Sequence, residues 1–448
     1  MFKKVLIANR GEVACRIIRA CRQLNIATVA VYSTADRDAL FVHQADEAYC
    51  IGPANAKKSY LNREAVLMAG IIANVDAIHP GYGFLSEDAL FAKMCAQCDI
   101  TWLGPTADLI ELMGNKAAAR KFAASRGIAI IPGTFVLNDL DHAKQAAKKI
   151  GYPLLIKASQ GGGGKGIRLV NNVAQLQAQL AIARQEAGSS FANNEIYLEK
   201  VLQSARHIEV QVIGDQAGNI QVLGDRDCTL QTRRQKVIEE SPATFITQAQ
   251  RRELVQMVHQ LLDNCNYQGL GTIEFLFNQD RFYFLEMNTR LQVEHGVTET
   301  TTGLDIVLLQ LQLAANDARL PDYIPSNEGV AIECRLTLTT PTQVNQLKMF
   351  NFPATMRVDT GYQAGDFIPP FYDSLLAKMI VSAPTRSKAI NKMNSALAQV
   401  RIDGVQSNLS QLQSIIASDW YQSNQFLVTT LDARITTNES TAKKGNLD

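Results

Sequence analysis

The sequence lacks the features that mark membrane-spanning and nucleic-acid-binding proteins. Nowhere in its 448 residues does an apolar run reach about 18 residues, the length that would cross a bilayer. An excess of charge of one sign is also missing, because 44 Lys and Arg against 43 Asp and Glu leave a formal net charge of +1. This balance gives no support to a role on nucleic acids or on acidic membranes.

Cysteine is sparse, and the eight that occur are scattered. Only Cys95 and Cys98 form a C-x-x-C pair, and no second pair follows at the spacing of a zinc site. We therefore expect reduced, buried or partly buried thiols, with a redox or metal role for this pair as the alternative. The short apolar run at the start has no small-residue cleavage site after it, so we interpret it as the first strand of a cytoplasmic protein rather than a signal peptide.

The first part of the chain alternates strands and helices. Apolar, β-rich runs at 4–8, 28–32 and 76–79 enclose a segment of helical spacing at 12–24. Such alternation predicts an α/β domain with a parallel sheet and helical crossovers. The turn after the first strand lacks the second and third glycines of a dinucleotide-binding fingerprint, which disfavours an NAD site.

The pattern of predicted strands and helices changes near residue 114. From about 135 to 200 the pattern predicts a smaller α+β unit, and from 206 to 290 strands dominate around one helix. A polar connection at 315–329, which contains two prolines, indicates a domain boundary. The length of the chain suits roughly two to four domains.

Four successive glycines lie in the segment 159–166, between two apolar strands. Because glycine has no side chain, backbone N–H groups there can approach a phosphate closely. The segment is not a Walker A loop, since no Ser or Thr follows Lys165 and a strand comes next. Lys157 on the preceding buried strand needs an anionic partner, which a phosphate would supply. We interpret the loop as a flap over a nucleotide; a mobile linker is the alternative.

Two β-rich runs, 272–277 and 282–288, are separated by a short turn and predict a hairpin. Folding it about Asp280 places Glu274 opposite Glu286, an arrangement of like charges that destabilises a sheet unless a cation lies between them. Asn288 shares their face. Two carboxylates and an amide oxygen suit Mg²⁺ or Mn²⁺ held with nucleotide phosphates. The alternative is a solvated strand face with spare acids.

Two further patterns place polar groups near this hairpin. Arg290 and Glu294, four residues apart just past it, can offer a cation to an anionic substrate and a base to deprotonate it; a local ion pair between them is the alternative. Strict alternation puts His207, Glu209 and Gln211 on one face of a strand, which faces either solvent or a nucleotide.

Several motifs, taken together and in order, resemble biotin carboxylase, the ATP-grasp component of biotin-dependent carboxylases. The resemblance runs from about residue 3 to residue 430, through IANRGE (7–12), HPGYGFLSE (79–87), IKAS and GGGGKG (156–166), GDRDC (224–228), QKVIEE (235–240), FLEMNTRLQVEH (284–295), ECR (333–335) and PPFYDS (369–374). It implies an α/β and α+β multidomain fold with a pre-ATP-grasp α/β domain at 1–113, an ATP-grasp domain at 114–316 with a mobile lid at about 130–203, a β-rich C-terminal domain at 329–433 and a flexible tail at 434–448.

The resemblance also implies roles for individual residues. The residues it assigns to ATP are Lys116, Lys157, Gly163, Gly164, Glu199, Lys200, Val201, Leu202, His207, Gln231 and Arg234. The metal ligands are Glu274, Glu286 and Asn288, and the two carboxylates also serve the nucleotide. The residues that it assigns to bicarbonate are Lys236, Arg290, Gln292 and Val293, with Glu294 as general base. Biotin would contact Tyr82 and Arg335, and Arg335 would stabilise its enolate.

The chemistry that this resemblance implies has two steps and needs ATP with Mg²⁺ or Mn²⁺. Bicarbonate is phosphorylated to carboxyphosphate, which then carboxylates the ureido nitrogen of biotin. Lys236, Arg290, Glu294 and Arg335 would be the catalytic residues. No biotin-accepting segment is visible, so we expect a separate biotin carboxyl carrier protein and carboxyltransferase subunits, as in acetyl-CoA carboxylase. The resemblance also implies a homodimer.

The chain departs from the family pattern at three places. Arg234 stands where the family has a histidine, Gly296 replaces a proline after Glu294-His295, and the segment 336–354 differs and is shorter. These departures motivate a second hypothesis, a catalytically weak paralogue that serves as an assembly or regulatory subunit. A third hypothesis is an ATP-grasp ligase that acts on another acid. The presence of Tyr82, Lys236 and Arg335 argues against it.

Overall fold

A computed structural model describes residues 1–137, 139–160, 167–191, 193–321, 329–340 and 345–434. Gly163 and Gly164, four residues of the 336–354 segment and the tail from 435 onward lie outside the described residues. No helix in the described ranges combines the length and apolar character needed to cross a membrane.

The N-terminal domain is a parallel five-stranded sheet in the order β3-β2-β1-β4-β5, with helices on both faces, as the alternating pattern predicted. The strands are β1 Lys4–Ile7, β2 Ala27–Ser33, β3 Glu47–Gly52, β4 Ala77–His79 and β5 Thr101–Trp102. The helices are α1 Gly11–Gln23, α2 Leu40–Gln44, α3 Arg63–Ile72 and α4 Ala89–Gln97. Successive side chains of β1 enter different cores, Val5 and Ile7 with α1 and Leu6 with α3 and α4, which is why this strand is apolar throughout.

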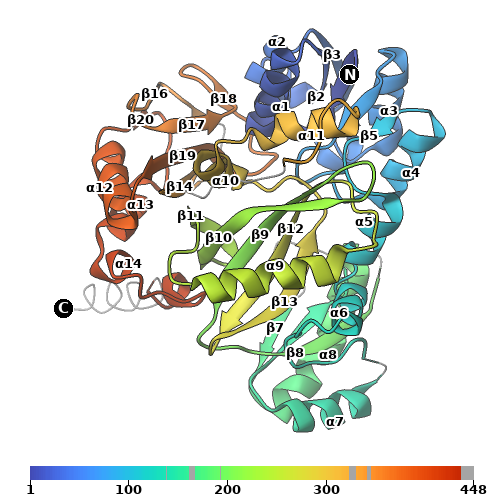
Figure 1. Cartoon of the computed structure of the whole chain (residues 1–448), viewed down its shortest axis with the longest axis vertical. Coiled ribbons are helices and arrows are strands. Elements are labelled where there is room, and N and C mark those ends of the chain that lie inside the picture. Colours follow the sequence, from blue (N-terminus) through green and yellow to red (C-terminus); the bar gives the residue numbers. More distant parts are fainter. Residues whose placement is uncertain (138, 161–166, 192, 322–328, 341–344, 435–448) are drawn as a thin grey trace.

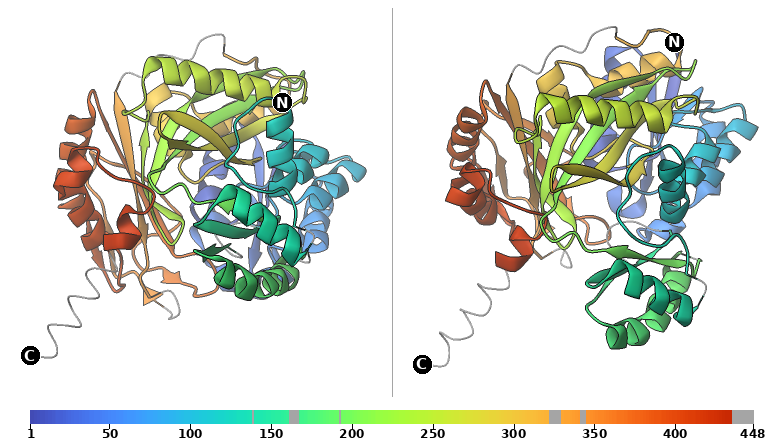
Figure 2. Two further views of the ribbon diagram at one scale, coloured as in Figure 1. Left: turned by 90° about the horizontal axis from the view of Figure 1, so that it is seen from below. Right: turned by 60° about the horizontal axis from the view of Figure 1, so that its bottom comes forward.

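A small three-stranded antiparallel sheet follows, after α5 Ala107–Gly114 and α6 Lys116–Ser125. Its order is β7-β6-β8. Its elements are β6 Leu154–Ala158, β7 Ile167–Val170, β8 Ile196–Lys200, α7 Leu140–Ile150 and α8 Val173–Phe191. The unit has a hydrophobic core of its own, and Figures 1 and 2 show it projecting from one end of the molecule.

The centre of the molecule is an antiparallel sheet in the order β13-β12-β9-β10-β11-β14-β19-β17. Its strands are β9 Arg206–Gly214, β10 Ile220–Thr232, β11 Gln235–Ser241, β12 Gly269–Asn278, β13 Arg281–Asn288, β14 Val330–Thr337, β17 Arg357–Thr360 and β19 Leu375–Ala383. Because β11 pairs with β14, one sheet runs through the regions 114–316 and 329–433, so those domain boundaries stay a prediction.

Both faces of this sheet are buried at its centre. Helix α9 Gln248–Leu262 covers one face in Figure 1 and packs on Ile208, Val210 and Val212 of β9. Helices α10 His295–Thr302 and α11 Ile306–Ala314 follow β13, and α10 packs against β10, β11, β14 and β19. The polar face of β9 therefore lies in the interior.

The C-terminal part packs short strands and three helices around β14 and β19. These elements are β15 Asn345–Gln346, β16 Met349–Asn351, β18 Phe367–Ile368, β20 Arg401–Asp403, α12 Arg386–Leu397, α13 Leu409–Ala417 and α14 Asp419–Gln422. They pack on the far half of the central sheet, where β14 pairs with the edge of β11 that would otherwise be open.

Arg226 of β10 joins the central strands to α10. It is fully buried, and its guanidinium donates to Glu209, Gln211, Thr272 and Thr298. These bonds use all the donors that a guanidinium has, so the charge is paired and no N–H is left over.

Replacing Arg226 by Met should destabilise the protein strongly, because Glu209 would keep a buried charge with one cation fewer. We expect a loss of about 3–5 kcal/mol in the free energy of unfolding, measured by urea titration. The control is R281M on the exposed end of β13, where a change within about 0.5 kcal/mol is expected. Equal effects of the two substitutions would contradict this role for Arg226.

Candidate active site

The hairpin of β12 and β13 pairs Glu274 directly with Glu286, which confirms that predicted pair, although a bulge between Glu274 and Phe275 shifts the register of the hairpin by one residue. Glu274 is buried, and its carboxylate accepts from Asn288 Nδ2 at 2.7 Å and from Lys236 Nζ at 3.2 Å. Glu286 contacts the ammonium of Lys116, the first residue of α6. Each of the two opposed acids thus contacts a different lysine, which offsets their repulsion.

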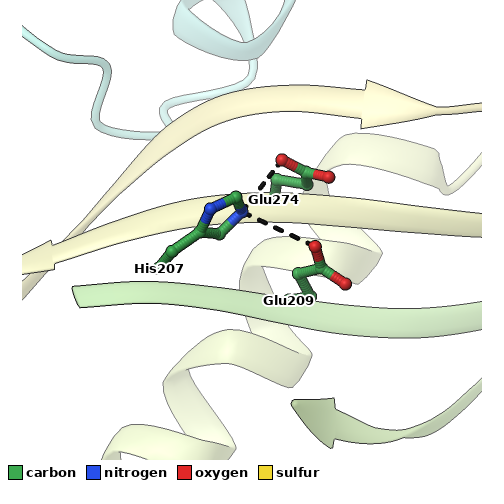
Figure 3. Close-up of side chains that lie close together, drawn as sticks. All are labelled: His207, Glu209 and Glu274. Carbon is green, nitrogen blue, oxygen red and sulfur yellow. Dashed lines mark ion pairs between the residues drawn. The ribbon is translucent and has the colours of Figure 1, made fainter. Parts of the chain in front are cut away.

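A buried histidine lies between two acids on neighbouring strands (Figure 3). His207 Nε2 is 2.9 Å from Glu274 Oε2 and 3.6 Å from Glu209 Oε1. On the other side of the ring, Gln231 Nε2 lies 2.7 Å from Nδ1 and so assigns Nδ1 as the acceptor and Nε2 as the donor. The alternative that this face of β9 meets solvent is wrong, because Gln211 and Glu209 are fully buried.

Glu294, the N-cap residue of α10, is held between two cations. Lys236 Nζ lies 2.6 Å from one carboxylate oxygen, and an Arg335 guanidinium nitrogen lies 2.8 Å from the other. Burial alone would raise the pKa of Glu294, but Lys236 and Arg335 outweigh it and hold that pKa well below the usual range. Glu294 is therefore ionised in the ligand-free site.

Lys236 serves three buried carboxylates at once. Besides Glu294 and Glu274, its ammonium contacts Glu209, whose other oxygen binds Arg226. Burial disfavours the charge of Lys236, but the three acids raise its pKa well above the ordinary value. Burial raises the pKa of Glu209 to about 7, a shift that Lys236 opposes and Glu294 reinforces.

The alternative that Arg290 forms a local ion pair with Glu294 is wrong. Arg290 Nε donates to Glu87 of the N-terminal domain at 2.9 Å, and its terminal nitrogens donate to Asn288 Oδ1 and Gln292 Oε1 at 2.9 and 3.0 Å. Gln292 also donates to Glu274 at 3.2 Å. Arg290 therefore connects the N-terminal domain to the hairpin end, next to Glu294 in the chain.

The residues of the small three-stranded unit that the resemblance assigns to ATP form a second group. Lys157 contacts Glu199, and Glu199 also accepts from the fully buried Arg120 of α6 at 2.8 Å. The expected partner of Lys157 was a phosphate; the structure gives it a carboxylate within the same small sheet. Lys200 donates to the carbonyls of Gly151 and Tyr152, so its ammonium is hydrogen-bonded within the same small unit.

The remaining assigned residues lie around these groups. Val201 and Leu202 follow β8 and are partly buried. Arg234 occupies the tight turn between β10 and β11 with a φ of 64°. Tyr82 donates its hydroxyl to Glu12 of α1. Gly163 and Gly164 lie outside the described residues.

Sequence reasoning missed several charged residues behind the site: Glu12, Arg120, Arg226, Glu239 and Lys378. Glu239 accepts from Arg335 Nε at 2.5 Å, and burial raises its own pKa although Arg335 opposes this. Strand alternation carried a partial signal, because Glu239 and Glu333 are direct cross-strand partners on β11 and β14. Oxygen and nitrogen atoms of His207, Glu209 and Glu274 lie within 4.8 Å of one another, as do ligand atoms of Glu209, Cys228 and Glu294.

Three family models match consecutive parts of the chain. They are "Biotin carboxylase, N-terminal domain" at 1–110, "Carbamoyl-phosphate synthase L chain, ATP binding domain" at 115–322 and "Biotin carboxylase C-terminal domain" at 333–433. Biotin carboxylase of Haemophilus influenzae is 44% identical over 454 residues, covering 98% of this chain and all of that protein.

Two solved structures superpose closely. The biotin carboxylase domain dimer of Hydrogenobacter thermophilus 2-oxoglutarate carboxylase, in complex with MgADP, ADP and bicarbonate, has a TM-score of 0.92 at 40% identity, covering 97% of this chain and 98% of that one. The Campylobacter jejuni biotin carboxylase–βγ-ATP complex has a TM-score of 0.93 at 38% identity, covering 97% and 99%.

Gly296 is constrained by packing. A Cβ atom at this position would lie 2.4 Å from Cδ1 of Ile380, and Ile380 is itself buried. The side chain of Ile380 therefore fills the space that a Cβ at residue 296 would occupy, which restricts this turn although a glycine stands there.

We expect G296A to destabilise the protein by about 1 kcal/mol, because overpacking exceeds the gain from helix propensity. In an I380V background, which removes Cδ1, the same substitution should be neutral or stabilising. Urea titrations of the four proteins in a double-mutant cycle check this. Additive effects would show that Ile380 does not restrict residue 296.

The pH dependence of stability should report the ion pairs of Glu294. Its folded-state pKa lies well below its ordinary 4.5, so its contribution is complete above that value and is lost as the pH falls. Urea midpoints measured from about pH 5 to about pH 3 should therefore fall less steeply in E294Q than in the parent. E253Q on the exposed side of α9 is the control and should keep the parent slope.

Proposed function

The chain belongs to the biotin carboxylase family of ATP-dependent ligases, and we propose that it carboxylates biotin on a separate carrier protein in the first half-reaction of an acetyl-CoA carboxylase. Nothing in the fold restricts this family to one final acceptor, since a 2-oxoglutarate carboxylase has the same domain in Hydrogenobacter thermophilus. The acceptor is therefore part of the proposal, whereas the biotin carboxylase family and its ATP-dependent chemistry are shown.

One observation carries the proposal: an ionised Glu294 lies between Lys236 and Arg335. A carboxylate with a low pKa is a weak base while both cations hold it. A bicarbonate anion that binds beside Lys236 and Arg290 competes for the same positive charge, which raises the pKa of Glu294 and lets it accept the substrate proton. Val293 and Gln292 border this position in the chain, and we assign them to the same substrate.

The nucleotide side uses the lysines and the hairpin acids. Glu274 and Glu286 are cross-strand partners, and Asn288 donates its amide nitrogen to Glu274 while its amide oxygen accepts from Arg290. We assign the two carboxylates and, after rotation of the amide, the oxygen of Asn288 to Mg²⁺ or Mn²⁺, which prefer such hard oxygen donors. A bound divalent cation would neutralise the triphosphate. Lys116 and Lys157, now paired with carboxylates, would then turn to the phosphates.

Other nucleotide contacts are assigned by position. The residues that we propose for the base and ribose side are Glu199, Lys200, Val201, Leu202, His207, Gln231 and Arg234, with Gly163 and Gly164 on the lid loop. Lid closure would exclude water from the labile carboxyphosphate.

The biotin side faces the C-terminal domain. Arg335 reaches Glu294 from β14, and we assign it to the biotin enolate, with Tyr82 as a second contact. We propose a homodimer, like the dimer reported for the Hydrogenobacter thermophilus domain. The proposed partners are a biotin carboxyl carrier protein and carboxyltransferase subunits in the cytoplasm.

Bicarbonate-dependent ATP hydrolysis, measured with and without free biotin, tests the function. We expect biotin to stimulate phosphate release, and E294Q to lower the rate by about 100-fold, the order of a lost general base. E253Q, on the exposed face of α9, should retain the parent rate.

Three results would each point elsewhere. ATP binding without bicarbonate-dependent turnover, unchanged in E294Q, would favour the assembly or regulatory subunit. Phosphate release that needs another acid would favour the alternative ligase. Carboxybiotin that supports carboxylation of 2-oxoglutarate but not of acetyl-CoA, with each carboxyltransferase supplied, would refute the proposed acceptor.

A further inference from the structure

Lys378 of β19 is a fully buried cation next to the proposed site. In the central sheet it pairs with Arg335 of β14 on one side and with Asp359 of β17 on the other. Cross-strand partners in an antiparallel sheet point to the same face. Lys378 and Arg335 therefore leave the sheet side by side, toward the loop that ends at Glu294.

The ammonium of Lys378 has one hydrogen-bond acceptor and two acidic neighbours. It donates to the carbonyl of Val293 at 2.9 Å and forms ion pairs with Glu12 Oε1 at 3.1 Å and Asp359 Oδ2 at 3.8 Å. Burial opposes the charge, but Glu12 and Asp359 raise the pKa of Lys378 above its ordinary value. A charged donor in a buried site binds a carbonyl more strongly than a neutral one.

The bond to Val293 fixes the peptide group that leads into Glu294. The preceding carbonyl, that of Gln292, lies 2.8 Å from His295 Nδ1 and also accepts from the His295 backbone at 3.3 Å. With both carbonyls held, the backbone at Glu294 keeps φ −80° and ψ 14°, and its side chain is directed between Lys236 and Arg335. The partners of the Lys378 ammonium in these contacts are Val293, Glu12 and Asp359, so it acts on Glu294 through the backbone and not directly.

The same lysine reaches the opposite side of the site through Glu12. One oxygen of Glu12 forms the ion pair with Lys378 and also accepts from the hydroxyl of Tyr82. Three segments far apart in sequence, α1, the loop before α10 and β19, therefore meet at one ammonium group.

We propose that Lys378 is a positioning residue that aims Glu294 at bicarbonate through the Val293 carbonyl and sets Tyr82 through Glu12. This inference rests on the proposed function, because it assigns a role in the same site. It predicts that losing Lys378 weakens the use of bicarbonate while the nucleotide groups on the lid, which it does not touch, keep their affinity.

K378M tests the inference by removing the charge while keeping an apolar chain of similar length. We expect kcat/KM for bicarbonate to fall about 10- to 100-fold, as for a lost hydrogen bond to a charged group, with KM for ATP within about 2-fold of the parent. Amide hydrogen exchange of the segment 291–297 should accelerate. The matched control is K392M. Lys392 of α12 is exposed, and it donates to the carbonyl of Ser382, which lies on β19 like Lys378.

A second variant addresses the case in which K378M does not fold. The double substitution K378M/E12M replaces the buried pair by apolar side chains and leaves Asp359 paired with Arg357, so it avoids an unpaired buried charge on Glu12. It should fold and show the same loss with bicarbonate. A general structural defect would instead lower ATP affinity and bicarbonate use together.

The outcomes separate the inference from the proposed function. A parent protein without bicarbonate-dependent turnover would refute the function, and unchanged exchange at 291–297 in the variants would then also refute the positioning role. A parent protein that turns over, with variants that keep its bicarbonate kcat/KM and its exchange rates, would refute the inference alone.

Discussion

The structure depends on one lysine that is shared by three buried acids. Lys236 contacts Glu209, Glu274 and Glu294, which come from β9, β12 and the start of α10. Like charges this close cannot all stay ionised without a cation among them. Burial makes water a poor substitute, so the ammonium determines how closely these elements pack.

The continuous sheet explains how cations from two distant parts of the chain meet at Glu294. β11 brings Lys236 from the side of the hairpin acids, and its neighbour β14 brings Arg335 from the C-terminal side. A site between two independent domains would depend on how they happened to sit. Here a backbone ladder sets the separation of the two cations, and a carboxylate at the N-cap of α10 bridges them. Rigid strands of this kind are suited to holding a base within hydrogen-bond range of a small substrate.

The β12–β13 hairpin could be predicted from local sequence, because a short turn joins two β-rich runs. Folding it about Asp280 gave the observed pair of Glu274 and Glu286, but the turn alone does not set that pair. The pairs next to the turn, such as Phe277 with Phe282, would continue to Glu274 opposite Leu285, and a bulge between Glu274 and Phe275 shifts the register by one residue. The pairing of Glu209 with Arg226 did not follow, since β9 and β10 begin with Gly214 opposite Ile220 and an irregularity then shifts the register by one residue. Without it, Glu209 would face Asp225. The contacts of Lys378 with Val293 and Glu12 span 85 and 366 residues (378 − 12), and no spacing rule reaches so far.

The departures from the family pattern can now be weighed by what they touch. Gly296 was one reason to consider a catalytically weak paralogue, because a proline there would stiffen the turn after Glu294. The direction of Glu294, however, is set by groups other than residue 296: Lys378 holds the preceding carbonyl, and Lys236 holds the carboxylate. Ile380 also fills the space beside the glycine. Gly296 therefore gives no argument against turnover, and the case for a weak paralogue narrows to the differing segment at 336–354, whose residues 341–344 lie outside the described ranges.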